Sequence, residues 1–358
     1  MAQALPPGST IGILGGGQLG RMLALAAGQL GLNCHIYAPE KDSPAFQVSA
    51  AHTVADYRDE KALAQFAASV SAVTYEFENV PVEAVRLLEQ RVPVRPGSKA
   101  LDVAQDRLKE KNLARSLGAM TANFAAINSR DDLASAIKAI GVPAVLKTTR
   151  FGYDGKGQAK IMTPADCDAA SAAMKGQPAI LESFVRFKSE MSVICARGID
   201  GTFAAYEPTE NVHLNHILHT STVPASIAPE LAAEAVYIAQ RMAEALDYVG
   251  VMGVEFFVGE DVLYVNEIAP RVHNSGHWTQ DACLVSQFEQ HIRAVAGWPL
   301  GATARHSNVV MTNLIGADAD QWQTLAAEPG TAVHLYGKAQ SRPGRKMGHV
   351  NRISRLAD

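Results

Sequence analysis

Apolar and polar stretches alternate along the first part of the chain in a way that predicts strands and helices in turn. The apolar runs are short, as in buried strands, and the segments between them repeat apolar positions at helical spacing. Strands joined by helices form right-handed crossovers, so this region is predicted to be one half of a doubly wound parallel fold. The predicted strands are 11–14, 33–37, 51–54 and 72–75, and the predicted helices are 19–30, 60–69 and 82–90.

The pattern changes after a charged helical stretch at 98–118, which Gly118 is expected to end. From there strands follow one another more closely, which is typical of an α+β region with antiparallel sheets. The turn Gly259-Glu260-Asp261 marks one hairpin. The predicted helices of this region are 131–140, 164–175 and 228–246, and its predicted strands are 144–148, 158–162, 179–185, 190–196, 202–207, 251–258 and 262–267.

The length of the chain, 358 residues, suits two or three domains. The changes of pattern place boundaries near residues 120 and 305. We therefore expect an α/β and α+β protein in three parts. These are a half-Rossmann domain at 1–120, an α+β domain at 121–305 and a small β-rich domain at 306–358.

Composition and charge exclude several classes of protein. The hydrophobic fraction is 47% and the charged fraction 19%, as in ordinary globular proteins. A net charge of -4 leaves no basic surface for nucleic acid, and no apolar run approaches the roughly 20 residues that span a bilayer. The N-terminus has no signal-peptide pattern, and the four cysteines form no C-x-x-C pair. We expect a cytoplasmic protein with free, buried thiols.

A glycine-rich loop follows the first predicted strand. Gly15, Gly17 and Gly20 satisfy G-x-G-x-x-G, and Glu40 lies about where a ribose-binding carboxylate would follow, ~20 residues on. This motif by itself favours an NAD(P) oxidoreductase. A complete dinucleotide-binding domain needs two halves, however, and the pattern predicts one. A second interpretation is that the loop and the N-terminus of the following helix face an anionic substrate.

A second glycine-rich loop, Lys147-TTRFGYDGKGQ-Gln158, lies between two predicted strands. Glycine lets backbone N–H groups approach phosphate oxygens, and basic side chains supply positive charge. The spacing differs from that of a P-loop, which would also precede a helix. We expect a phosphate-binding turn. Its glycines are Gly152, Gly155 and Gly157, and its cations are Lys147, Arg150 and Lys156.

Two carboxylates occupy neighbouring strands of the predicted hairpin. Glu255 and Glu267 can share one face of an antiparallel pair, beside Asn266. Carboxylate and amide oxygens are ligands that suit Mg²⁺, which would bridge to nucleotide phosphates. The neighbouring positions are apolar, so both acids are predicted to lie on buried strands, where an acid needs a partner. At another apolar strand end, Glu182 is expected beside an adenine and Glu190 beside a ribose.

Together these elements resemble the ATP-grasp superfamily, in which two α+β subdomains hold ATP between antiparallel sheets. Longer motifs narrow the resemblance to the N5-carboxyaminoimidazole ribonucleotide synthase family. The resemblance extends from about residue 11 to residue 349. The motifs are GGGQLGRM at 15–22, GYDGKGQ at 152–158, NEIAPRVHNSGHWTQDAC at 266–283 and RPGRKMGH at 342–349.

The resemblance implies an ATP-dependent C–N ligase of de novo purine biosynthesis. In that family ATP phosphorylates bicarbonate to carboxyphosphate, which releases carbon dioxide beside the exocyclic amine of 5-aminoimidazole ribonucleotide. The products are N5-carboxyaminoimidazole ribonucleotide, ADP and phosphate. The resemblance further implies Mg²⁺ (with Mn²⁺ as an alternative), a homodimer, and transfer of the labile product to a downstream mutase.

The resemblance also assigns roles to residues of this sequence. Asp154 is expected to hold or deprotonate the attacking amine. Arg271, His273 and Asn274 are expected to bind bicarbonate and carboxyphosphate. The expected metal ligands are Glu255 and Glu267. Contacts to ATP are expected from Arg107, Lys147, Gly152, Tyr153, Asp154, Gly155, Lys156, Gly157, Gln158, Glu182, Ser183, Phe184, Val185, Glu190, His213, Asn266 and Glu267. Contacts to the ribonucleotide are expected from Gly17, Gln18, Glu76, Tyr153, Arg271, Lys338 and Arg345, with Arg342 and Lys346 as further cations near its phosphate.

Three other functions remain open at this point. Another ATP-grasp ligase would keep the ATP contacts but use a different acceptor, and the run APRVHNSGHWTQ favours bicarbonate chemistry over it. An NAD(P) oxidoreductase would explain the first glycine loop, but it gives no use for Glu255 and Glu267. A nucleotide-sensing protein without activity would not need the full set of charged residues.

Overall fold

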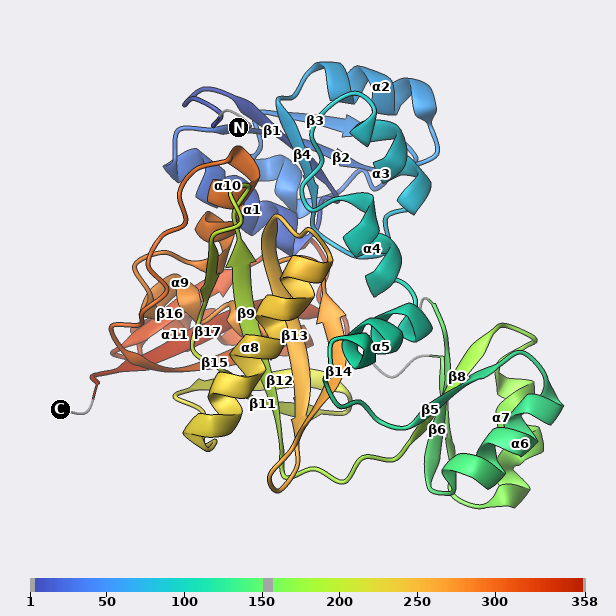
Figure 1. Ribbon diagram of the computed structural model, residues 1–358. Helices are drawn as coiled ribbons and strands as arrows, with labels where there is room; N and C mark the ends of the chain where they lie inside the picture. Colours follow the sequence, from blue (N-terminus) through green and yellow to red (C-terminus); the bar gives the residue numbers. More distant parts are fainter. Residues whose placement is uncertain (1–3, 151–156, 357–358) are drawn as a thin grey trace.

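The N-terminal part is a small parallel sheet with helices packed on it (Figure 1). The computed structural model describes residues 4–150 and 157–356. The strand order β3-β2-β1-β4, with every pair parallel, is that of one half of a doubly wound fold, as the alternating pattern predicts. The elements are β1 (Thr10–Leu14), α1 (Gln18–Gln29), β2 (Asn33–Ala38), the 3₁₀ helix η1 (Pro44–Val48), β3 (Ala51–Val54), α2 (Glu60–Ala68), β4 (Ala72–Tyr75) and α3 (Val82–Glu89).

The charged stretch that follows forms two helices, so the prediction of one continuous helix is wrong. α4 (Ser98–Ala104) and α5 (Arg107–Ser116) are separated around Asp106. The backbone of Asp106 is extended, and its carboxylate accepts hydrogen bonds from the N–H groups of Leu108 (3.0 Å) and Lys109 (3.3 Å). This N-cap starts α5 afresh. A capping acid inside a charged stretch does not change the spacing of hydrophobic residues. The hydrophobic pattern therefore does not predict the break between α4 and α5.

A second sheet stands at one end of the molecule, with two helices beside it (Figure 1). Its strands are antiparallel in the order β5-β8-β6-β7. The strands predicted on either side of the second glycine loop pair with each other, and Lys147 lies opposite Gln158. The elements are β5 (Phe124–Ile127), α6 (Arg130–Ile140), β6 (Ala144–Thr148), β7 (Gln158–Ile161), η2 (Pro164–Asp166), α7 (Cys167–Ala173) and β8 (Ala179–Ser183).

The rest of the chain builds one large antiparallel sheet in the order β14-β13-β9-β11-β12-β15-β17-β16, with β10 on the side of β9. The C-terminal strands are therefore continuous with the sheet of the central part. The strands are β9 (Ser189–Arg197), β10 (Phe203–Ala205), β11 (Thr209–Leu214), β12 (Ile217–Val223), β13 (Gly250–Val258), β14 (Leu263–Ala269), β15 (Asn308–Ile315), β16 (Thr331–Leu335) and β17 (Lys346–Ser354). The helical segments are α8 (Pro229–Ala245), η3 (Asn274–Gly276), α9 (Thr279–Ala282), α10 (Gln287–Ala296), η4 (Gly316–Gln321) and α11 (Trp322–Ala327).

A shared hydrophobic core joins the N-terminal sheet to the large sheet. Helix α1 packs against α10, and Leu23, Trp278 and Ile292 belong to one cluster of buried side chains. Burial of each such side chain stabilises the packed state by roughly 2 kcal/mol. The two parts that face each other across the candidate site are therefore held firmly together.

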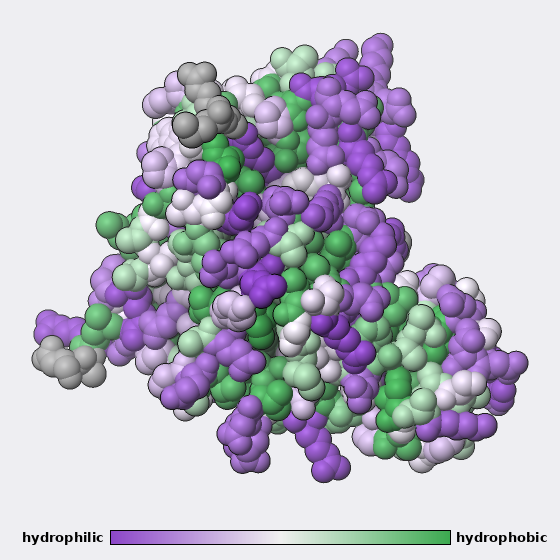
Figure 2. All heavy atoms as spheres, in the orientation of Figure 1, coloured by the Kyte–Doolittle hydropathy of each residue, from purple (hydrophilic) through white to green (hydrophobic). Residues whose placement is uncertain are grey.

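The hydrophilic surface and the state of the cysteines are those that the composition predicts. In Figure 2 hydrophilic side chains (purple) cover much of the visible face, with hydrophobic ones (green) between them. Within the described residues, no helix combines the length and the apolar character needed for a membrane crossing. The cysteines of the described residues are free and buried, as predicted.

Candidate functional site

A cleft of about 570 Å³ runs between the N-terminal sheet, strands β6 and β7 of the small sheet, and the large sheet. Its lining is mainly polar and charged, and it brings together residues from widely separated parts of the sequence. The predicted site residues that line it are Gly17, Gln18, Glu76, Arg107, Lys147, Gln158, Glu190, His213, Glu255, Asn266, Glu267, Arg271, His273 and Asn274.

The first glycine loop holds a carboxylate of the protein itself. Glu76, directly after β4, accepts hydrogen bonds from the backbone N–H groups of Gly17 and Gly20, the latter at 2.5 Å. A Cβ at Gly17 would lie 2.6 Å from Glu76 Oε1, so the loop needs glycine there. Burial raises the pKa of Glu76, and the two N–H groups oppose that shift. Glu76 engages the donors that would hold a pyrophosphate, which argues against the NAD(P) oxidoreductase.

The two predicted metal ligands are direct neighbours across a strand pair. Glu255 on β13 lies in register with Glu267 on β14, beside a β-bulge that follows Glu255. Burial and the charge of Glu255 raise the pKa of Glu267. Burial would also raise the pKa of Glu255, but the hydrogen bond from His273 and nearby positive charge lower it to about 2. Arg107 Nη1 lies 3.6 Å from Glu267 Oε2. The side chain of Glu255 is 15% exposed and that of Glu267 is 45% exposed, so the two carboxylates open to the cleft and are well suited to share a cation there.

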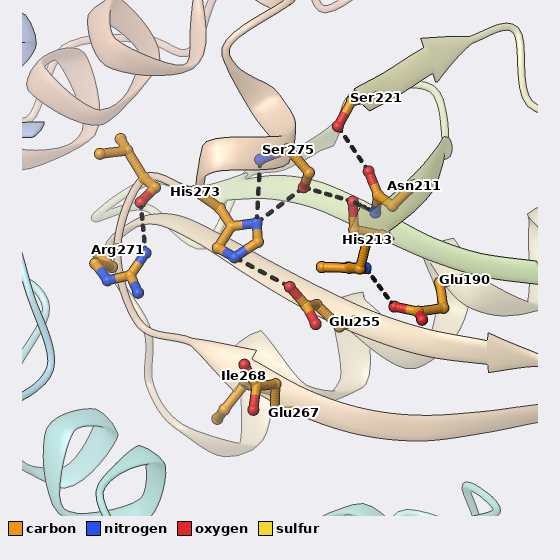
Figure 3. A network of polar contacts seen from close by, with 12 residues as sticks. Glu190, Asn211, His213, Ser221, Glu255, Glu267, Ile268, Arg271, His273 and Ser275 are labelled. Atoms are coloured by element: carbon orange, nitrogen blue, oxygen red, sulfur yellow. Dashed lines mark hydrogen bonds and ion pairs between the residues drawn. The ribbon is translucent and has the colours of Figure 1, made fainter. Parts of the chain in front are cut away.

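Arg271, His273 and Asn274 follow β14 and line the cleft beside the carboxylate pair, and Figure 3 shows Arg271 and His273 in place. His273 Nε2 is 3.1 Å from Glu255 Oε1. Asn274 is 9% exposed, and neither polar atom of its amide has a hydrogen-bond partner within the described part of the chain. A buried amide without a hydrogen-bond partner destabilises the fold by about 1–3 kcal/mol. We therefore expect this amide to bind a ligand.

An acid that the sequence analysis missed holds Arg271. The guanidinium donates to both carboxylate oxygens of Glu78, with Nη2 3.0 Å from Oε1. Burial would raise the pKa of Glu78, but Arg271 lowers it below its usual range. Glu78 lies in the turn that follows β4, two positions after Glu76. Its closeness in sequence to a predicted site residue was the available signal. The ion pair links the N-terminal part to the large sheet.

Gly253 on β13 makes room for His273. A Cβ at this position would lie 2.8 Å from His273 Cβ and 3.0 Å from its Cγ. We expect Gly253→Ala to displace the imidazole from Glu255 and to lower kcat by about tenfold to a hundredfold, with folding retained. Steady-state rates and thermal melting check this.

The control for that substitution is Gly28→Ala on α1, where a Cβ would meet nothing within 4 Å. It should leave kcat unchanged and slightly raise the melting temperature, because alanine favours a helix. Wild-type turnover in Gly253→Ala would mean that the His273 position does not matter.

A smaller pocket of about 100 Å³ opens behind Lys147, between the small and large sheets. Ser183, Phe184 and Val185 line it from the end of β8, and Phe257 of β13 is a further lining residue. A narrow, largely apolar slot beside a basic residue suits an adenine ring whose phosphates extend into the cleft. Three residues predicted to contact ATP, Ser183, Phe184 and Val185, therefore lie together in one pocket.

Glu182 is a buried anion between two lysines. It pairs with Lys147, and its Oε1 lies 3.4 Å from Lys111 Nζ. Burial would raise the pKa of Glu182, but the two lysines lower it to about 2. The side chain thus fixes Lys147 at the cleft, a role that the prediction of Glu182 beside adenine did not include. Lys111 was missed, although it follows Arg107 by one helical turn.

The pKa of Glu182 predicts part of the acid sensitivity of the fold. A carboxyl group whose pKa is lower in the folded than in the unfolded chain stabilises the fold above its unfolded pKa. With about 2 in the folded chain, the contribution is about 3 kcal/mol at neutral pH, and it is lost as the pH falls from about 4.3 to 2. Urea unfolding of wild type and Glu182→Gln at pH 7, 5 and 3 should give a stability gap that narrows at pH 3.

The exposed Glu230 on α8 provides the control for this prediction. Glu230→Gln should differ little from wild type in its free energy of unfolding at each pH. A Glu182→Gln gap that stays constant from pH 7 to pH 3 would contradict the assigned shift.

Glu190 and His213 form one ion pair rather than two separate contacts (Figure 3). They lie on the adjacent strands β9 and β11, with Glu190 Oε2 2.6 Å from His213 Nδ1. Burial would lower the pKa of His213, but Glu190 raises it. Both line the cleft, so a ligand at this position meets the pair as a unit.

The cations predicted for the substrate phosphate lie beside the cleft lining. Lys338 Nζ donates to the backbone oxygen of Lys346 at 2.6 Å, and Arg345 Nη1 donates to the backbone oxygen of Gln340 at 2.7 Å. Burial and the charge of Arg345 lower the pKa of Lys338 to about 8. Lys346 itself lines the cleft. Positive charges crowded in this way favour an anion next to them.

Part of the second glycine loop lies outside the described residues. The predicted residues concerned are Gly152, Tyr153, Asp154, Gly155 and Lys156. The described Gly157 accepts a hydrogen bond from the N–H of Thr148 (2.9 Å), and its φ of 69° is in the region that favours glycine. Gln158 lines the cleft.

Glu110 on α5 is a further acid that the sequence analysis missed. It lines the cleft and accepts a hydrogen bond from the N–H of Ile268. Burial raises its pKa to about 8. It follows Arg107 by three positions and therefore faces the same side of the helix. Because this stretch contains many charged residues, the spacing of Arg107 and Glu110 does not stand out in the sequence.

Family models match three consecutive stretches of the chain. The model described as a ribonucleotide synthetase preATP-grasp domain matches residues 9–105. The ATP-grasp domain model matches residues 112–288, and the phosphoribosylaminoimidazole carboxylase C-terminal domain model matches residues 309–358.

Individual relatives match along nearly the whole chain. The N5-carboxyaminoimidazole ribonucleotide synthase of Brucella melitensis biotype 1 is 51% identical over 353 residues, which cover 98% of this chain and 98% of that protein. A crystal structure of an N5-carboxyaminoimidazole ribonucleotide synthetase with ADP has a TM-score of 0.95 and 43% identity, covering 99% of this chain and 94% of that one. The synthase of Aspergillus clavatus, in complex with ADP and 5-aminoimidazole ribonucleotide, has a TM-score of 0.91 and 30% identity, covering 98% and 95%.

Proposed function

The chain belongs to the N5-carboxyaminoimidazole ribonucleotide synthase family, and from this premise we propose how its cleft performs the reaction. The enzyme is an ATP-grasp ligase that carboxylates 5-aminoimidazole ribonucleotide in purine biosynthesis. The observation that carries the site proposal is one continuous arrangement. The small pocket suits adenine, and it adjoins the cleft. Along the cleft lie the carboxylate pair and then the anion-binding side chains, next to the N-terminal sheet.

ATP binds between the two antiparallel sheets in this proposal. The base occupies the pocket formed by Phe184, Val185 and Phe257. Lys147, held by Glu182, meets the phosphates, together with Arg107 of α5. The Glu190–His213 pair contacts the ribose. The second glycine loop, with residues 152–158, covers the phosphates.

The metal proposal rests on the carboxylate pair. Within residues 4–150 and 157–356, no group of three or more His, Cys, Asp or Glu side chains is arranged to hold a metal ion alone. Glu255 and Glu267 are nevertheless adjacent and line the cleft, so they fit a cation that takes its other ligands from phosphate oxygens and water. Mg²⁺ or Mn²⁺, bound by these two acids with Asn266 nearby, would neutralise phosphate charge during transfer.

Bicarbonate is the proposed co-substrate. One of its oxygens forms a bond to the γ-phosphorus of ATP while the bond to the bridging oxygen breaks, which gives carboxyphosphate and ADP. Arg271, His273 and the unpartnered amide of Asn274 are positioned to hold this small anion. Carboxyphosphate then releases phosphate and carbon dioxide. Exclusion of water would matter at this step, because carboxyphosphate also reacts with water.

The ribonucleotide is proposed to lie against the N-terminal sheet. Glu76, with the neighbouring Gly17 and Gln18, faces its ribose, because a carboxylate suits the ribose hydroxyls. Lys338 and Arg345 supply positive charge for its phosphate. Its exocyclic nitrogen bonds to the carbon of carbon dioxide and loses a proton. We assign that proton to Asp154, with Tyr153 beside the substrate, on the family resemblance.

ADP release with Mg-ATP tests this proposal, in bicarbonate-free buffer and with each co-substrate added in turn. Release should be strongly stimulated by 5-aminoimidazole ribonucleotide when bicarbonate is present, and ¹³C-bicarbonate should label the product. No stimulation from a protein that still binds ATP would overturn the acceptor assignment and favour another ATP-grasp ligase.

We also propose a cytoplasmic homodimer that passes its product to a mutase, on the family resemblance. Light scattering of the purified protein tests the oligomer, and a monomer would contradict it. A coupled assay with added mutase tests the transfer, which predicts less product decay than free diffusion allows.

A further inference from the structure

A row of hydrogen bonds leads from the site into the large sheet (Figure 3). His273 Nδ1 lies 2.8 Å from Ser275 Oγ, which lies 2.6 Å from Ser192 Oγ. Asn211 Nδ2 donates to Ser192 Oγ at 2.9 Å, and Ser221 Oγ donates to Asn211 Oδ1 at 2.7 Å. The row joins η3, β9, β11 and β12. Ser192, Ser221 and Ser275 are fully buried, and Asn211 is 5% exposed.

Both ends of the imidazole have neighbours that fix the place of its proton. At one end, the backbone N–H of Ser275 points to His273 Nδ1 at 3.4 Å, and a backbone N–H can only donate. Nδ1 therefore accepts. At the other end, Nε2 is 3.1 Å from the carboxylate of Glu255, which offers acceptor atoms. Nε2 therefore carries the proton.

The direction of every remaining bond in the row follows from that assignment. Because Nδ1 accepts, the hydroxyl of Ser275 donates to it and must receive its own hydrogen bond from Ser192. Ser192 has then used its single proton, so it accepts from the amide nitrogen of Asn211. The amide oxygen of Asn211 is left to accept from Ser221. One pattern satisfies all members, and a reversed amide would leave Ser192 with two acceptors and one proton.

We propose that Ser275, Ser192 and Asn211 are positioning residues that hold His273 in the tautomer with its proton on Nε2. This inference rests on the proposed role of the cleft. The ring then acts as a fixed N–H donor towards Glu255, beside the place proposed for the reacting anion.

Nitrogen NMR of ¹⁵N-histidine-labelled protein tests the tautomer directly, with His273→Asn used to assign the signal. The free wild type should show His273 with its proton on Nε2. A proton on Nδ1, or on both nitrogens at neutral pH, overturns the proposal. This readout needs no substrate, so it stands apart from the acceptor question, which the ADP-release assay decides.

Kinetics of Ser275→Ala test the positioning role. This change should lower kcat about tenfold, leave the KM for ATP within about twofold, and shift the Nδ1 resonance of His273. Ser192→Ala, one bond farther from the ring, should lower kcat about threefold and serves if Ser275→Ala does not fold.

Thr74→Val is the matched control. Thr74 Oγ1 lies 2.8 Å from His291 Nε2, so the change breaks a fully buried hydroxyl–histidine contact away from the cleft. It should cost comparable stability but leave kcat and the His273 resonances unchanged. Wild-type kcat in Ser275→Ala, or an equal loss in Thr74→Val, overturns the proposal.

Discussion

Glu267→Gln is expected to lower kcat by about a thousandfold or more while melting no lower than the wild type. The amide keeps the shape of the side chain but removes the charge that we assign to cation binding. Burial and the charge of Glu255 raise the pKa of Glu267, so the ionised acid is disfavoured by the fold. Losing that charge should therefore not destabilise the protein. Single-turnover assays and calorimetry measure the two effects separately.

Glu260→Gln is the control for this result. Glu260 lies in the turn of the same hairpin and pairs with the exposed Lys188 at 2.8 Å. Its substitution should change kcat by less than about twofold. Removal of divalent cations should abolish activity in the wild type, and added Mg²⁺ or Mn²⁺ should restore it. Retention of more than about a tenth of wild-type turnover by Glu267→Gln would contradict the metal assignment.

Arg271→Lys is expected to lower kcat/KM for bicarbonate about a hundredfold. Lysine keeps the positive charge but lacks the planar fork that donates to both oxygens of Glu78. The anion would then meet a mobile ammonium group. Initial rates against bicarbonate concentration, at saturating ATP and ribonucleotide, give the parameter that should change most.

Arg293→Lys provides the comparison for Arg271. Arg293 also pairs with a carboxylate, Glu289 on α10, at 2.6 Å, but it does not line the cleft. It should leave the bicarbonate dependence unchanged. Glu78→Gln should affect the same parameter as Arg271→Lys, because it frees the guanidinium. Equal results from Arg271→Lys and Arg293→Lys would remove Arg271 from anion binding.

Much of the fold follows from the chain pattern, and the predicted fold class is confirmed by the matching family models. The parallel sheet was accessible because each of its strands is a short apolar run between helical segments. The strands β11 and β12 could not be predicted from the pattern, and the residues at their buried positions explain why. Asn211 and Ser221 point into the core as part of a polar row, so apolar and polar positions do not alternate there.

The site divides in the same way. The nearness of Glu255 and Glu267 could be predicted because both acids lie on one hairpin, but their direct pairing depends on a β-bulge after Glu255 that shifts the register by one residue. Glu78 and Arg271 are 193 positions apart, and their contact depends on how the N-terminal sheet docks on the large one. A local sequence pattern does not predict how two sheets pack on each other, so this contact could not be predicted. The resemblance supplied the reaction, which the relatives support.

The continuous large sheet has a consequence for synthesis on the ribosome. β17 is the last strand of the sequence in that sheet, yet it lies between β15 and β16 and is needed to join them. Until it emerges, β15 has a free edge. Free edges invite pairing with other chains, so a partly made chain is exposed to aggregation during this interval. For β15 the hazard ends only when β17 has paired with it.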